Sequence, residues 1–201
     1  RPTCHVAFGE ATALLAGDAL QAEAFAVLGR ARLRDAAAAC VLLAEASGAA
    51  GMAGGQAIDL DATGRAMTEA ELERMHRMKT GALIRAACRM GAILGKAPQA
   101  ARGALDRYGF ALGQAFQIAD DLLDLEGDPE TLGEKTNKDA AAGKATFIAI
   151  LGVDGARARL AALVADAEAA LGQFGEEAAM LRAAARFVAE RLWKMKPRAV
   201  G

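Results

Sequence analysis

The sequence contains few aromatic residues and very little proline. Only 4% of its 201 residues are aromatic and four are prolines, whereas alanine is abundant and 54% of the chain is apolar. No segment alternates apolar and polar residues for long enough to indicate a β-strand. Because proline ends helices and alanine favours them, the composition predicts an all-α fold. The length suffices for one sizeable core, and no linker or repeat divides it, so residues 1–201 are expected to form a single domain.

The chain also has little net charge, few cysteines and no long apolar run. The formal net charge is −1, which excludes the broad basic surface of a nucleic-acid-binding protein. The apolar runs, such as residues 36–44, are too short to span a bilayer, and the first residues do not resemble a signal peptide. The cysteines are odd in number and widely spaced, which indicates reduced thiols in a cytoplasmic protein. They are Cys4, Cys40 and Cys88.

Apolar residues recur with helical spacing along most of the chain. After an irregular lead-in over residues 1–8, the pattern predicts helices at about 9–28, 33–46, 68–90, 99–126, 145–151, 155–171 and 176–193, followed by a frayed tail. The first helix is apolar on nearly all sides, so it is expected to be buried in the domain or at a subunit interface. Thr68 and Glu71 have the spacing of a capping box at the start of a helix, and Pro98 marks another helix start.

The glycine-rich stretch at residues 51–56 lacks the Lys-Ser/Thr pair of a phosphate-binding loop and follows no strand. It is interpreted as a turn that allows two helices to approach closely. Asp18 and Gln21 are polar positions in the first helix whose role the sequence leaves open.

Four polar side chains interrupt the apolar helix at residues 111–125. Gln117, Asp120, Asp121 and Asp124 are spaced i, i+3, i+4 and i+7, so they share one helix face. Neighbouring carboxylates repel one another, and the C-terminal end of a helix disfavours negative charge. A bound cation resolves this conflict, and oxygen ligands suit Mg²⁺ that is shared with substrate phosphates. The alternative is an acidic, solvated helix face.

Lysines occur in two other places that bear on this site. Lys79 lies on an apolar stripe with Met75 and Leu83, so it either extends to solvent or meets an anion inside. The polar segment 133–147, which contains Lys135 and Lys144, follows the aspartate helix directly and is either a diphosphate-binding loop or a plain solvated loop. His76 is more typical of a structural residue than of a ligand.

No serine-histidine or cysteine-histidine arrangement, zinc ligand set or dinucleotide fingerprint is present. Carboxylates for a metal, a helix lysine and a lysine loop suit chemistry in which a metal-bound diphosphate leaves within a dry, apolar pocket.

Five motifs together resemble the trans-polyprenyl diphosphate synthases, most closely the bacterial farnesyl diphosphate synthases. In chain order they are FGEATALLAGDAL, GMAGGQAIDL, HRMKTGALI, GQAFQIADDLLDLEGD and DAAAGKATF. The resemblance runs from residue 1 to about residue 191. It implies a helix bundle around a central cavity, a homodimer, and Mg²⁺-dependent condensation of dimethylallyl or geranyl diphosphate with isopentenyl diphosphate to give farnesyl diphosphate.

The resemblance also implies roles for individual residues. Asp120, Asp121 and Asp124 match the second aspartate-rich motif and its metal ligands. Lys79 and Thr80 match a Lys-Thr pair that holds the allylic diphosphate and faces the developing cation, and Gln117 faces the same region. Lys144 matches a diphosphate lysine. Lys135 is favoured over Glu134 for the other loop lysine, because a one-residue insertion shifts the expected position.

The family's first aspartate-rich motif, its Arg-Arg-Gly and its N-terminal helices have no counterpart in these 201 residues. The chain is therefore interpreted as a partial synthase domain, inactive alone. A geranylgeranyl diphosphate synthase, a non-catalytic partner subunit and a terpene cyclase are the alternatives. The Lys-Thr pair argues against the cyclase, and product length is not legible from this part of the chain.

Overall fold

The computed structural model describes residues 2–31, 34–126 and 145–194, and all regular structure in these ranges is helical. The helices are α1 (Cys4–Phe8), α2 (Glu10–Arg30), α3 (Ala36–Ser47), α4 (Met52–Asp61), α5 (Glu69–His76), α6 (Ala82–Leu94), α7 (Gln99–Glu126), α10 (Phe147–Ala170) and α11 (Ala179–Lys194), with a π-helix η1 (Arg77–Gly81) and a short 3₁₀ turn η2 (Glu176–Ala178). The all-α prediction is confirmed.

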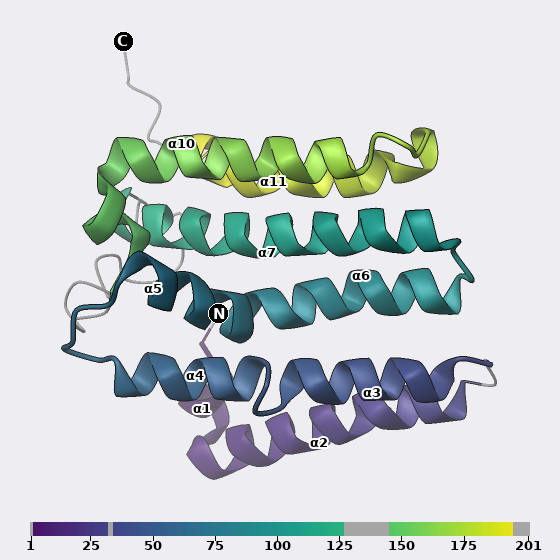
Figure 1. The fold of residues 1–201 in the computed structure, drawn as a ribbon. Helices are drawn as coiled ribbons and strands as arrows, with labels where there is room; N and C mark the ends of the chain where they lie inside the picture. The colour runs from purple at the N-terminus through teal and green to yellow at the C-terminus, as the bar shows by residue number, and fades with distance from the viewer. Residues whose placement is uncertain (1, 32–33, 127–144, 195–201) are drawn as a thin grey trace.

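The long helices run side by side, with α7 in the middle (Figure 1). One neighbour of α7 is the continuous rod formed by α5, η1 and α6, and the other is α10. The pair α3–α4 packs on the far side of that rod, and α2 lies at the outer edge beside α3. Segments 79–80 and 117–124 are thereby brought onto adjacent helices.

Helix α7 supplies the centre of the hydrophobic core. Its buried residues follow helical spacing and include Tyr108, Ala115, Ile118 and Leu122, each no more than 1% exposed. They pack against apolar residues of α5, α10 and α11. The hydroxyl of the buried Tyr108 donates to the Leu181 carbonyl oxygen at 2.8 Å, so its polar end is satisfied within the core.

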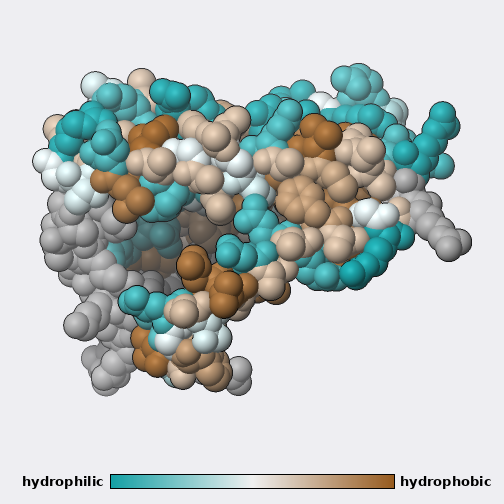
Figure 2. Space-filling model, turned by 90° about the horizontal axis from the view of Figure 1, so that it is seen from below, coloured by the Kyte–Doolittle hydropathy of each residue, from teal (hydrophilic) through white to brown (hydrophobic). Residues whose placement is uncertain are grey.

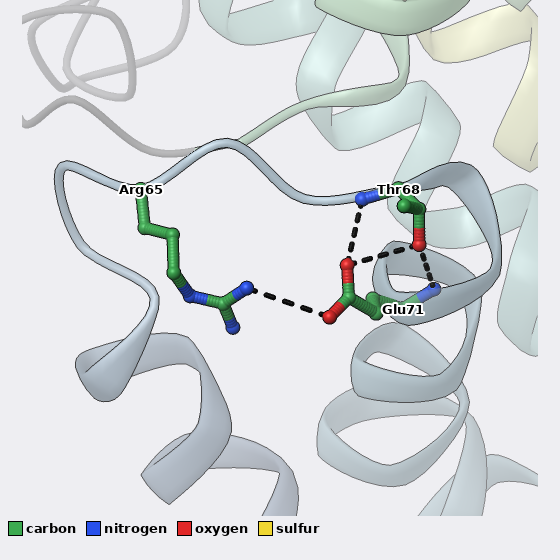
Figure 3. Close-up of polar contacts among 3 residues, drawn as sticks. All are labelled: Arg65, Thr68 and Glu71. Atoms are coloured by element: carbon green, nitrogen blue, oxygen red, sulfur yellow. Dashed lines mark hydrogen bonds and ion pairs between the residues drawn. The ribbon is translucent and has the colours of Figure 1, made fainter.

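The expected capping box starts α5 (Figure 3). The Glu71 amide donates to Thr68 Oγ1 at 3.3 Å, and the Thr68 amide donates to Glu71 Oε2 at 2.8 Å. The backbone hydrogen bond from Thr68 is the main cause that lowers the pKa of Glu71. Arg65 also reaches Glu71 at 3.4 Å, which ties the preceding loop to the helix.

Several predicted boundaries were wrong. Residues 4–8 form the short helix α1, and residues 52–56 lie inside α4 instead of in a turn. The single helix predicted from 68 to 90 contains a π-helix and extends to Leu94. The predicted division near residue 152 is present, because Gly152 interrupts α10 with φ 69°. The stop at Ser47-Gly48 and the helix start after Pro98 are confirmed.

Helix α2 has no buried residue among those that the structure describes, so the burial predicted for it is not found within this chain. By length and composition, α2 and the segment 36–61 are long and apolar enough to cross a membrane. The second of these is two helices separated at residues 48–51, and 28% of it is buried. Such weak signals are also given by core helices of soluble proteins.

We expect Thr68→Ala to lower the free energy of unfolding by about 1 kcal/mol, because the N-cap acceptor for the Glu71 amide is lost. Thr68→Ser keeps the hydroxyl and should stay close to wild type in urea unfolding. Equal losses in both variants would show that the cap is not the source of the stability.

Candidate functional site

The candidate site is built around the π-helix η1, which carries Lys79 and Thr80 between α4 and α7. A π-helix accommodates one extra residue per turn, and so it changes the direction in which the side chains on either side of it point. Here the two neighbouring side chains point to different helices, Lys79 toward α4 and Thr80 toward α7.

Lys79 forms an ion pair with Asp59 of α4. Its Nζ donates to Asp59 Oδ2 at 2.8 Å, and the side chains are 29% and 10% exposed. The sequence left open whether Lys79 extends to solvent or meets an anion inside the protein. The structure shows the second, because the ammonium group contacts the Asp59 carboxylate. Asp59 is not among the site residues predicted from the sequence. The sequence feature that could have pointed to Asp59 is its position four residues after Gly55. This spacing places it on the helix face that contacts η1 through Gly55.

Thr80 begins a chain of hydrogen bonds that ends at the start of α10. Its hydroxyl donates to Gln117 Oε1 at 3.2 Å, and Gln117 Nε2 donates to Asp121 Oδ1 at 3.1 Å. The other carboxylate oxygen, Asp121 Oδ2, accepts the Phe147 amide at 2.9 Å. The network fixes the Gln117 amide with its oxygen toward Thr80.

The three aspartates share a helix but lie in different environments. Asp121 is buried at 3% exposed, Asp124 is partly buried, and Asp120 is exposed. Asp121 therefore has a structural part in holding α10 against α7. Asp120 and Asp124 offer carboxylate oxygens one helical turn apart, a donor set that suits Mg²⁺.

Within residues 2–31, 34–126 and 145–194, no group of three His, Cys, Asp or Glu side chains is arranged to hold a metal ion. Mg²⁺ is usually held by one or two protein carboxylates together with water and substrate phosphates. Lys135, Lys144 and Glu134 lie outside the described residues. Asp18 and Gln21 are exposed on α2.

His76 is buried next to η1. Its ring centroid lies 5.3 Å from that of Phe147, and its Nδ1 has no hydrogen-bond partner among the described residues. Burial, and secondarily the positive charge of Lys79, lower the pKa of His76 to about 4, although Asp59 opposes this shift. The imidazole is therefore neutral at physiological pH, as expected of a structural residue.

Figure 2 shows that the face seen from below is hollowed. Three concavities of about 520, 400 and 340 Å³ are lined by other residues and include neither Lys79, Thr80 nor Gln117.

Comparison with known proteins agrees with the family resemblance of the five sequence motifs. The family described as polyprenyl synthetase matches residues 1–181. The farnesyl diphosphate synthase of Escherichia coli is 47% identical over 199 residues, which cover 94% of this chain. The chain spans 67% of the length of that relative and 61% of two others, so it corresponds to part of their length.

Two solved structures share the fold. The farnesyl/geranylfarnesyl diphosphate (FPP/GFPP) synthase of Zymomonas mobilis is 42% identical with a TM-score of 0.81, over 93% of this chain and 64% of that one. A geranyltransferase of Helicobacter pylori, whose structure contains magnesium and isoprenyl diphosphate, is 28% identical with a TM-score of 0.80, over 96% of this chain and 64% of that one.

The neutral state of buried His76 predicts a pH-dependent stability. The unfolded chain binds a proton near pH 6.5, but the folded one does so only near 4. The free energy of unfolding should therefore fall as the pH drops through this window, by up to about 3 kcal/mol.

Urea unfolding across that range tests the prediction. His76→Gln should flatten the dependence between pH 6.5 and 4, whereas His5→Gln, at the other histidine of the chain and exposed on α1, should not. An unchanged slope in His76→Gln would contradict it.

Proposed function

The chain belongs to the polyprenyl synthetase family, and from this we propose that it is the part of a short-chain prenyl diphosphate synthase that binds the allylic diphosphate. We treat residues 1–201 as a single, partial domain. In the proposed reaction the allylic C–O bond breaks, diphosphate leaves, and the double bond of isopentenyl diphosphate attacks the allylic carbon. The proton lost from the adduct is taken up by the released diphosphate.

The observation that carries the proposal is the divergence of Lys79 and Thr80 from one π-turn. Lys79 Nζ has three donors, and only one of them is directed at Asp59 Oδ2. The remaining donors are available to diphosphate oxygens, while Asp59 holds the ammonium group in place. Positive charge fixed in advance near the leaving group stabilises the charge that develops there.

Thr80 presents its oxygen to the reacting carbon. Because its proton is donated to Gln117, the lone pairs of Oγ1 point away from that bond. Gln117 is itself held by Asp121, so the hydroxyl is not free to turn. An oriented oxygen dipole next to a developing carbocation lowers its energy without a covalent bond to the protein.

Asp120 and Asp124 are the residues proposed to hold Mg²⁺, with Lys135 and Lys144 as further diphosphate ligands. Bound Mg²⁺ would neutralise charge on the diphosphate and so make it a better leaving group. Asp121, which the family resemblance also implies as a metal ligand, is buried and is proposed to act through its hold on Gln117.

Farnesyl diphosphate is the favoured product, because relatives with that name are 38–47% identical over most of the chain. A geranylgeranyl diphosphate synthase of Cyanophora paradoxa is 36% identical. The longer geranylgeranyl diphosphate is therefore the second candidate product. A non-catalytic partner subunit would need the same fold but no metal ligands, and Asp120 and Asp124 argue against it.

We further propose that the protein is a cytoplasmic homodimer in which α2 packs against a second copy. Figure 2 shows hydrophobic side chains on the face seen from below, the side on which α2 lies in Figure 1. The large apolar residues of α1 and α2 that are at least half exposed are Val6, Phe8, Leu14, Leu15, Leu20 and Val27. Exposed apolar surface on this scale is typical of an interface.

The function is tested in a chimera in which this chain replaces the matching part of the Escherichia coli relative. We expect Mg²⁺-dependent formation of farnesyl diphosphate from geranyl and isopentenyl diphosphates. Asp120→Ala should lower kcat by about 100-fold or more, because charge on the leaving group is no longer balanced, and it should not unfold the protein. Asp154→Ala, at an exposed carboxylate of α10, is the control. Equal rates for the two variants would contradict the assignment.

Sedimentation velocity tests the dimer. The chain should sediment as a dimer, and Leu20→Glu should make it monomeric because a charge is buried at the interface. Met180→Glu, at an equally exposed apolar residue of α11, should leave the dimer intact. A monomer in the unmodified protein would exclude this arrangement.

A further inference from the structure

Two glycines bring neighbouring helices into backbone contact with η1. Gly55 of α4 lies against Lys79: a methyl group in place of its hydrogen would be 2.2 Å from the Lys79 nitrogen and 2.6 Å from its Cα. Gly113 of α7 lies against the end of the same segment, where a methyl group would be 2.7 Å from the Gly81 Cα. All three distances involve backbone atoms, which cannot move aside as a side chain would.

Each glycine is followed, four residues later, by the side chain that binds η1. On α4 the pair is Gly55 and Asp59, and on α7 it is Gly113 and Gln117. A spacing of four places both members of a pair on one helix face. The same arrangement thus occurs on both sides of the π-helix: one turn makes the close approach, and the next turn supplies the polar contact.

We propose that Gly55 and Gly113 are positioning residues of the site, which hold η1 between them so that Asp59 reaches Lys79 and Gln117 reaches Thr80. The chemical role of Lys79 and Thr80 rests on the function proposed above. The positioning itself is a claim about contacts that are present in the structure.

The size of the effect follows from contact distances. Carbon atoms pack at about 3.5 Å or more, so a methyl group at Gly113 must move η1 and α7 apart by roughly 0.8 Å. The Thr80–Gln117 hydrogen bond, now 3.2 Å, would then be about 4 Å and no longer a hydrogen bond. At Gly55 the methyl group would be only 2.2 Å from the Lys79 nitrogen, so the displacement must be larger there, and it would break the 2.8 Å hydrogen bond between Lys79 and Asp59.

Helix α7 supplies two controls. Gly109 also contacts α6 closely, with a methyl group 2.9 Å from the Arg85 Cα, but it lies one turn away from Gly113 and faces neither Lys79 nor Thr80. Gly103 has only an arginine side chain nearby, at 3.6 Å. Gly109→Ala therefore reports the general effect of separating α6 and α7, and Gly103→Ala reports that of adding a methyl group to the helix.

The experiment compares Gly55→Ala, Gly113→Ala and the two controls in the 201-residue chain. The first readout is NMR of the Thr80 methyl group and of ¹³C-methylated Lys79, whose signal is assigned by its absence in Lys79→Arg. We expect the Lys79 signal to move in Gly55→Ala and the Thr80 signal to move in Gly113→Ala. Both should stay in place in Gly109→Ala even where its melting temperature falls.

The second readout is calorimetric binding of inorganic diphosphate with Mg²⁺. The Kd should rise about tenfold or more in Gly55→Ala and Gly113→Ala, which corresponds to 1.4 kcal/mol, and change less than twofold in the controls. In the chimera these variants should lower kcat for the allylic substrate, whereas Gly109→Ala should not.

Each outcome decides between the claims. Unchanged Lys79 and Thr80 signals in the folded alanine variants, or the same shifts in Gly109→Ala, would overturn the positioning role. If neither alanine variant folds, Asp59→Asn and Gln117→Leu are measured instead, and wild-type Lys79 and Thr80 signals in them would overturn it equally. The signals could instead shift in the alanine variants as expected while the unmodified chain binds no diphosphate. That result would support the positioning role and contradict the proposed function.

Discussion

The carboxylate of Asp121 is the acceptor on which the arrangement of the site depends. One oxygen accepts from Gln117 on its own helix, and the other accepts the first amide of α10. Loss of this acceptor would leave a buried amide unpaired, at a cost of about 1–3 kcal/mol. It would also release Gln117, and with it the orientation of the Thr80 hydroxyl. The same group therefore joins the packing of α7 and α10 to the geometry of the site.

This arrangement also changes how the three neighbouring aspartates of α7 are interpreted. A carboxylate at the C-terminal end of α7 is disfavoured by the dipole of that helix, which was a reason to expect a cation. Asp121, however, faces the N-terminal end of α10, where the dipole has the opposite sign and free amides need acceptors. The structure thus accounts for the carboxylate of Asp121 without a metal.

The sequence was sufficient to predict features that depend on local spacing. The Thr68 capping box, the helix 99–126 and the shared face of Gln117 and Asp121 follow from helical periodicity alone. Features that depend on packing between helices were missed. Gly55 looked like part of a turn because its backbone contact, with Lys79 of η1, involves a residue more than 20 positions away. Asp59 was overlooked for the same reason, and no periodic pattern signals a π-helix.

The π-helix has a consequence for how the rod from Glu69 to Leu94 tolerates change. Its extra residue changes the angular register between α5, where Leu72 and Met75 are buried, and α6, where Ala86 and Ala92 are buried. A deletion of one residue within Arg77–Gly81 would convert the segment to an ordinary helical turn and rotate everything beyond it by about 100°. The damage would extend along the 13 residues of α6 as well as the five residues of η1. The length of this segment is therefore as much a part of the site as the identity of its side chains.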